Sequence, residues 1–234
     1  LIPEPMGTGM MRSQVGVMWF HCIVRGHPVH VAYAGAGANA IEAAYRLIGE
    51  LHTLEAAWNG RGHERYAHMD HPLNFNVGKI EGGDWASSVP AWCRFDMRVG
   101  VFPGQDLATA RAEVENCVAE AARNDNFLAN SPPEIVWDGF QAEGYVLEEG
   151  TEVESVLRSS HQAVFGTEMA ERALTGTTDA RFFGLYANMP ALVYGPTAEN
   201  IHGFDERVNL ESCRQVTKAM ALFIADWCGI QAVG

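Results

Sequence analysis

The stretch Val15–Val24, VGVMWFHCIV, decides how the first half of the chain folds. It is dense in β-branched and aromatic residues, which favour an extended strand, and Gly26 ends it. After a loop rich in Gly and Ala, apolar residues recur every three or four positions over 40–54. This spacing predicts an amphipathic helix, for which Asn39 is a suitable N-cap. A strand is thus expected to lead into a helix.

The same change of periodicity recurs further along the chain. Residues 73–80 and 89–99 predict two strands joined by a turn, Asp106 caps a predicted helix over 107–124, and 134–137 predicts a short strand. The order β-α-β-β-α-β is the split βαβ pattern of ferredoxin-like α/β sandwiches. We therefore expect a four-stranded antiparallel sheet over 15–137, with two helices on one of its faces.

The remaining residues, 138–234, have a different pattern. Predicted helices over 152–165 and 210–227 flank the apolar run Ala191–Tyr194, which is typical of a buried strand and ends at Gly195. A helix, a buried strand and a helix indicate the edge of a doubly wound α/β layer. One strand cannot make a sheet alone, so we expect the apolar faces of this part to need a partner polypeptide or a further segment.

Composition excludes several classes of function. The chain has 29 acidic and 16 basic residues and a net charge of −13, which would repel a nucleic acid. No apolar run approaches the ~18 residues of a membrane span. Its five cysteines form no CxxC pair and no secretion signal is visible, so we expect free thiols and a cytoplasmic location.

Two histidines are candidate site residues by position, and the alternative for each is an ordinary loop residue. His30 lies in GHPVH, at a turn into small residues. His202 follows the run that ends at Gly195, and open α/β sheets form their sites beyond the carboxyl ends of strands. GxxxxGK[ST], GxGxxG and GxSxG motifs are absent from the sequence, which argues against a phosphate-binding loop and a serine nucleophile.

Five stretches, taken in order, resemble one enzyme family. This is the zinc-dependent metallopeptidase family of acetylornithine deacetylase, succinyl-diaminopimelate desuccinylase, aminoacylase and the glutamate carboxypeptidases. The matching stretches are PEP at 3–5, GHPVHVAY with GAGANAI over 26–41, GGDWASSVPAWCRFDMRVGVFPG over 82–104, TGTTDARFF over 175–183 and LVYGPTAENIHGFDERV over 192–208.

The resemblance implies a catalytic α/β domain that is interrupted by a lid, or dimerisation, domain. Residues 15–137 would be the lid domain, 1–14 a remnant of the catalytic domain and 138–234 its carboxyl-terminal part. Members of the family carry a long segment ahead of the EP motif, with a metal-binding His, a bridging Asp and an adjacent Glu pair. The chain would therefore act together with such an amino-terminal half.

The resemblance also implies roles for single residues. Glu4 and His202 match two ligands of a site that holds two zinc ions when complete, with cobalt or manganese as possible alternatives. His30 matches a histidine that enters the partner subunit's active site and stabilises the oxyanion. Arg98 matches the arginine that binds the substrate carboxylate, although its spacing from Pro90 is short for the family. Thr177 and Gly195 match positions that line the substrate site in the family.

The function implied is metal-dependent hydrolysis of an amide bond in N-acyl amino acids or small peptides, by a homodimer formed through the lid domain. The alternative is a non-catalytic dimerisation or binding module derived from the family. Metal content and hydrolysis of an N-acetyl amino acid distinguish the two.

Overall fold

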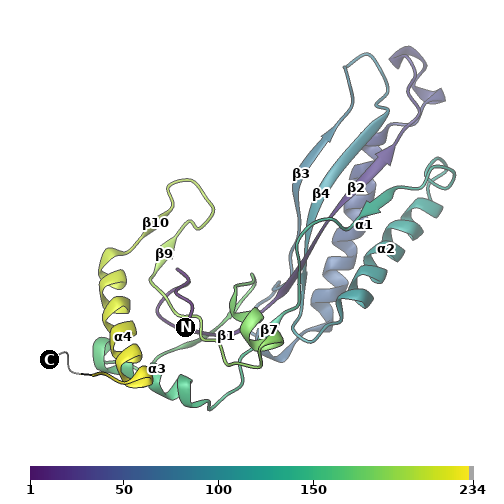
Figure 1. Cartoon of the computed structure of the whole chain (residues 1–234). Coiled ribbons are helices and arrows are strands. Elements are labelled where there is room, and N and C mark those ends of the chain that lie inside the picture. The colour runs from purple at the N-terminus through teal and green to yellow at the C-terminus, as the bar shows by residue number, and fades with distance from the viewer. Residues whose placement is uncertain (232–234) are drawn as a thin grey trace. The chain divides into compact units, whose positions relative to one another are not determined.

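The structure is a computed structural model that describes residues 1–231, and it divides into two compact units (Figure 1). Unit 1 consists of Leu1–Gln14 together with the chain from Tyr145 onward, and unit 2 is Val15–Gly144. The sequence-based boundary at 137 falls earlier than this division. The reason is strand β6 (Gln141–Ala142), which still pairs with a strand of unit 2.

Unit 2 contains an antiparallel sheet whose strands follow the order β3-β4-β2-β5, with β6 also paired to β2. Strands β2 and β4 pair in continuous register from Gly16 opposite Val101 to Arg25 opposite Trp92. The split βαβ order predicted from the sequence is confirmed. The bounds of these strands are β2 (Gly16–Arg25), β3 (Phe75–Gly82), β4 (Trp92–Val101) and β5 (Glu134–Val136).

Two helices, α1 (Ala40–Arg61) and α2 (Leu107–Arg123), lie side by side on one face of this sheet (Figure 1). Each begins at the predicted N-cap: Asn39 Oδ1 accepts from two helix amides, and Asp106 Oδ2 accepts from Thr109 N at 2.7 Å. Buried leucines of α1 and alternate residues of β2 and β4 form the core beneath. The alternation leaves the side chains of Trp19 and His21 on the opposite face of the sheet.

Unit 1 is built around β1 (Met10–Gln14). This strand pairs in parallel with β8 (Glu171–Leu174) and antiparallel with β7 (Tyr145–Val146). Helices α3 (Glu152–Phe165) and α4 (Leu210–Cys228) pack on each other. A short hairpin, β9 (Ala198–Glu199) and β10 (Arg207–Val208), precedes α4.

The apolar run Ala191–Tyr194 is buried, but the prediction that it forms a strand is wrong. Val193 forms an isolated parallel bridge with Ile2, and its carbonyl oxygen accepts from Met11 N of β1 at 3.1 Å. The three-stranded sheet of this unit has the order β7-β1-β8, with β1 at its centre. The run is apolar because it lies in the core, where Leu192 and Tyr194 pack in one cluster with Met10.

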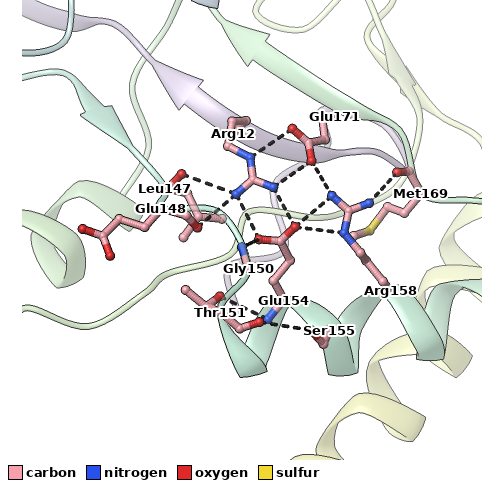
Figure 2. A network of polar contacts seen from close by, with 10 residues as sticks. All are labelled: Arg12, Leu147, Glu148, Gly150, Thr151, Glu154, Ser155, Arg158, Met169 and Glu171. Atoms are coloured by element: carbon pink, nitrogen blue, oxygen red, sulfur yellow. Dashed lines mark hydrogen bonds and ion pairs between the residues drawn. The ribbon is translucent and has the colours of Figure 1, made fainter.

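Strand β1 carries a buried arginine at the centre of an ion-pair network (Figure 2). Arg12 Nη2 lies 2.7 Å from Oε1 of both Glu154 on α3 and Glu171 on β8. Arg158 contacts the same two carboxylates, and Arg12 Nη1 also donates to the Glu148 carbonyl oxygen at 3.1 Å. The network ties β1, β8 and α3 together and compensates a charge that would be costly to bury alone.

Over residues 1–231, no helix combines the length and the hydrophobicity needed to cross a membrane.

Candidate functional site

In unit 1 the EP segment and the loop after Tyr194 lie against each other. Met6 forms an antiparallel bridge with Thr197, and Gly7 N donates to the Pro196 carbonyl oxygen at 2.9 Å. A Cβ added at Gly195 would lie 1.9 Å from the carbonyl oxygen of Glu4, far inside contact distance. Glycine is therefore required at this position, and the contact brings the predicted ligand Glu4 beside the predicted substrate-lining Gly195.

His202 lies in the turn of the β9–β10 hairpin, which starts three residues after Gly195. Its φ is +63°, a left-handed conformation that few non-glycine residues adopt, and Asn200 has a φ of +55° in the same turn. The hairpin is anchored at its base, where Thr197 N donates to Ser212 Oγ on α4 at 2.9 Å. The imidazole of His202 is exposed, so it is available to a ligand.

A carboxylate and an imidazole are suitable ligands for a divalent transition metal. Zinc takes at least three protein ligands, however, and the described part of the chain holds no cluster of three or more His, Cys, Asp or Glu that could bind a metal. Glu4 and His202 therefore do not complete a metal centre by themselves. A centre that used them would need ligands from outside the described residues.

Thr177 follows the carboxyl end of β8, in the loop after Leu174. Gln14 holds this loop, because its Oε1 accepts from both N and Oγ1 of Thr178 at 2.7 Å. The Oγ1 atom of Thr177 is buried and has no hydrogen-bond partner within the described residues. Such an unpaired buried hydroxyl costs about 1–3 kcal/mol, which points to a partner supplied by a ligand or a further segment.

His30 belongs to unit 2, in the loop between β2 and α1. The backbone N of Ala32 donates to its Nδ1 at 3.1 Å. In the neutral imidazole the proton must then be on Nε2, which makes that nitrogen a hydrogen-bond donor. His30 forms an isolated antiparallel β-bridge with Ser88 of the neighbouring loop. Its side chain is exposed. The loop thus presents a histidine whose tautomer is suited to donating to an oxyanion.

Arg98 also belongs to unit 2, on the open face of β4, with Trp19 beside it on β2. Its Nη1 donates to the Asn74 carbonyl oxygen at 3.3 Å, and partial burial lowers the pKa of the guanidinium. These two side chains line a cavity of about 360 Å³, together with His21, whose Nδ1 lies 3.0 Å from Asp138 Oδ1.

Sequence reasoning did not identify this cavity or the anchoring role of Gln14. His21 lies on β2 and is 8% exposed. The period-two pattern of VGVMWFHCIV could have indicated that Trp19 and His21 share one face. It contained no signal for the partner strand β4, whose residues complete the cavity.

Comparison with known proteins adds independent findings. The family model of the peptidase dimerisation domain matches residues 12–126. The chain is 25% identical over 222 residues to N-formyl-4-amino-5-aminomethyl-2-methylpyrimidine deformylase of Halalkalibacterium halodurans, which covers 91% of the chain and 51% of that relative. It is 25% identical to acetylornithine deacetylase of Pectobacterium carotovorum, over 97% of the chain and 56% of the relative. The chain thus spans about half the length of these relatives.

Among solved structures, human carnosine dipeptidase 1 is similar in fold. The TM-score is 0.72 at 11% sequence identity, and the match covers 97% of the chain and 58% of that protein. The similarity therefore extends over both units, and the solved protein is longer than the chain.

Proposed function

For a chain that belongs to the family of acetylornithine deacetylase and its deacylase and peptidase relatives, we propose metal-dependent hydrolysis of an amide bond in an N-acyl amino acid or small peptide. The observation that carries the proposal is the contact between Gly195 and the backbone of Glu4. It joins two segments nearly 200 residues apart in sequence, and both hold positions that the family uses in its site.

In this proposal Glu4 and His202 are two ligands of a zinc site, and the remaining ligands come from the amino-terminal half of the catalytic domain. Cobalt or manganese can replace zinc at such ligands. When bound, the metal supplies a Lewis acid that polarises the amide carbonyl and acidifies water. The main role of Gly195 is steric, since its missing side chain lets the loop approach the backbone of Glu4.

We assign substrate contacts to Thr177 and to Arg98. The Thr177 hydroxyl, which is buried without a partner in the described chain, would hydrogen-bond the substrate near the reacting amide. Arg98 would bind the free carboxylate, because a guanidinium fork matches carboxylate geometry. A protein with a net charge of −13 needs such a local cation to attract an anionic substrate.

His30 would act in the second subunit of a homodimer. The dimer would form through unit 2, which holds most of the residues matched by the dimerisation family. The Nε2–H of His30 would donate to the oxyanion that develops as the amide carbonyl is attacked, and a preorganised donor of this kind is worth ~10²–10³ in rate. We place the enzyme in the cytoplasm, in keeping with its cysteine usage.

The test uses the full-length protein that contains this chain, stripped of metal and then reloaded with zinc, cobalt or manganese. We expect metal-dependent hydrolysis of an N-formyl, N-acetyl or N-succinyl compound. Glu4→Gln and His202→Gln should each lower bound metal and activity together. The exposed Glu168 and His68 provide matched controls, because Glu168→Gln and His68→Gln should change neither quantity.

Two results would contradict the proposal. One is a folded, metal-loaded protein that hydrolyses none of these compounds while still forming dimers, which would instead support a non-catalytic dimerisation module. The other is full activity in both ligand variants.

A further inference from the structure

The open face of the unit 2 sheet carries a cavity with features of a ligand site. Its volume is about 360 Å³, which is within the size range of small-molecule pockets. Two rows of side chains line it, and the strand register brings each row together. Trp19, Arg98 and Asn76 form one row, and His21, Asp96 and Lys79 form the next.

An irregularity in the pairing of β3 with β4 accounts for the hollow in this face. The pairing of β3 with β4 shifts register between Val77 and Lys79, and the residue between them is Gly78. A Cβ added there would meet nothing closer than Asn76 Nδ2, at 3.6 Å. The sheet therefore lacks a side chain at the position where one would otherwise fill the cavity.

Trp19 is a rigid apolar wall of the cavity. Its ring packs against Phe140 with centroids 5.6 Å apart, and its backbone N donates to the Phe140 carbonyl oxygen at 2.9 Å. A Cβ at Gly139 would lie 2.5 Å from Trp19 Cβ, so this segment approaches the tryptophan closely. The ring still remains 48% exposed. A fixed, half-exposed indole offers a surface for another planar ring.

Cationic side chains outnumber carboxylates among the residues that line the cavity. The cations are Lys79, Arg94 and Arg98, and the carboxylates are Asp96 and Asp138. Both carboxylates are engaged: Asp96 accepts from Arg94 Nε at 2.8 Å, and Asp138 Oδ1 lies 3.0 Å from His21 Nδ1.

Lys79 is paired with Glu81 at 3.2 Å, but both side chains are largely exposed. Such a surface pair is weak enough to exchange partners with a ligand. The cavity thus places the guanidinium of Arg98 beside an aromatic wall.

We propose that this cavity binds the aromatic side chain and carboxylate of the substrate, so that the enzyme prefers N-acyl derivatives of aromatic amino acids. The ring stacks on Trp19 and the carboxylate meets Arg98. This inference rests on the proposed function for the role of Arg98, and it adds the class of side chain. An aliphatic substrate would leave the indole without a partner.

A direct binding experiment tests the cavity without turnover. The probe is 3-phenylpropionate, which carries a ring and a carboxylate but no amide bond, titrated calorimetrically into the full-length metal-loaded protein. The comparison probes are 3-phenylpropanamide, which lacks the charge, and propionate, which lacks the ring. We expect 3-phenylpropionate to bind about tenfold or more tightly than either, as expected for one stacked ring or one charged hydrogen bond.

Variants separate the two contacts. Trp19→Ala should weaken 3-phenylpropionate roughly 3–10-fold and leave propionate unchanged, because stacking contributes about 0.5–1.5 kcal/mol. Arg98→Gln should weaken both anions. Trp85 and Arg46 are exposed residues of unit 2 outside the cavity, so Trp85→Ala and Arg46→Gln serve as controls.

The outcomes distinguish this inference from the proposed function. Equal binding of 3-phenylpropionate and propionate, or undiminished binding in Trp19→Ala, would overturn the inference. Hydrolysis of N-acetyl-alanine and N-acetyl-phenylalanine with equal kcat/KM would also overturn it, while leaving the hydrolase proposal intact. Selective binding of 3-phenylpropionate by a protein that hydrolyses no amide would support the cavity and contradict the hydrolase.

Discussion

Gly195 lies so close to Glu4 that a single added methyl group would be 1.9 Å from the Glu4 carbonyl oxygen. The backbone of the EP segment is therefore positioned by the loop that follows Tyr194, which also leads into the hairpin with His202. Through this contact, a position with no side chain controls where the carboxylate of Glu4 lies.

Gly195→Ala should displace the EP segment. Forcing a methyl group against a backbone oxygen costs about 1–3 kcal/mol or more, and the shift should lower metal binding and activity of the full-length protein beyond the loss in stability. Chemical denaturation and metal analysis measure the two effects. Gly49 on α1 is the matched control, because nothing lies within 4 Å of its added Cβ and Ala favours a helix. If Gly195→Ala retained full metal content, the contact would have no role in the site.

His30 is expected to act on the active site of the other subunit. His30→Ala should lower kcat by ~10²–10³ with little change in unfolding temperature, because the side chain is exposed. Mixing His30→Ala subunits with His202→Ala subunits should restore part of the activity, since each mixed dimer then holds one site with both histidines. His27→Ala, in the same loop, is the control. No recovery on mixing, with subunit exchange verified, would place the action of His30 within its own subunit.

The ion-pair network of Figure 2 predicts an acid-sensitive unit 1. Hydrogen bonds from Arg12 hold the pKa values of Glu154 and Glu171 below their usual range. The stability that they contribute is therefore present above the unfolded pKa of about 4.3 and is lost as pH falls through the lower folded values. Unfolding free energy measured from pH 7 to pH 3 should fall at the acid end.

Arg12→Met should flatten this acid dependence. It should also destabilise the protein at pH 7 by about 3–5 kcal/mol, because it leaves carboxylates without their buried partner. Arg207→Met removes an exposed ion pair with Glu199 and should change stability by less than about 1 kcal/mol. An unchanged pH profile in Arg12→Met would contradict a stabilising role for the network.

Tyr194 and His161 form a buried hydrogen bond, with 2.9 Å between the phenol oxygen and Nδ1. Burial raises the pKa of Tyr194 to about 12 and lowers that of His161, so both are neutral near pH 7. Tyr194→Phe should cost about 1–3 kcal/mol, because it leaves Nδ1 unpaired in the core. The exposed Tyr45 supplies the control, since Tyr45→Phe should leave the unfolding temperature unchanged. Equal stability of the two variants would contradict this account.

The fold of unit 2 was predictable because its signals are local. The alternation in VGVMWFHCIV, the helical spacing of α1 and the caps Asn39 and Asp106 each depend on neighbouring residues, and the structure contains all of them. Strand β6 was missed because two residues are too short to show a period.

Unit 1 was less predictable because its central strand, β1, is buried although its sequence is not a run of apolar residues. The β1 sequence MMRSQ carries three polar residues, yet all of them are buried. Arg12 is satisfied by Glu154 and Glu171, and Gln14 by Thr178, at separations of 142 to 164 residues. No local pattern indicates such distant partners. The run Ala191–Tyr194 has the apolar sequence of a buried strand but does not form one. Its apolar character reflects burial in the core rather than pairing in a sheet.

In the candidate site, too, contacts between residues distant in sequence could not be predicted from local patterns. From the residues alone, Glu4 had no distinction and Arg98 was only an arginine late in a strand. The family resemblance assigned both, and the close approach at Gly195 supplies a physical reason for one matched motif. The cavity beside Trp19 depends on strand register and a bulge at Gly78, which become visible only when β2, β3 and β4 are paired.

The central claim is that Glu4 and His202 bind the same metal ion. Anomalous diffraction at the zinc edge, from crystals of the full-length protein loaded with zinc, tests it most directly. We predict a zinc ion with a Glu4 oxygen and a His202 nitrogen both at about 2.0–2.2 Å. An ordered zinc centre in which neither side chain is a ligand would contradict the account.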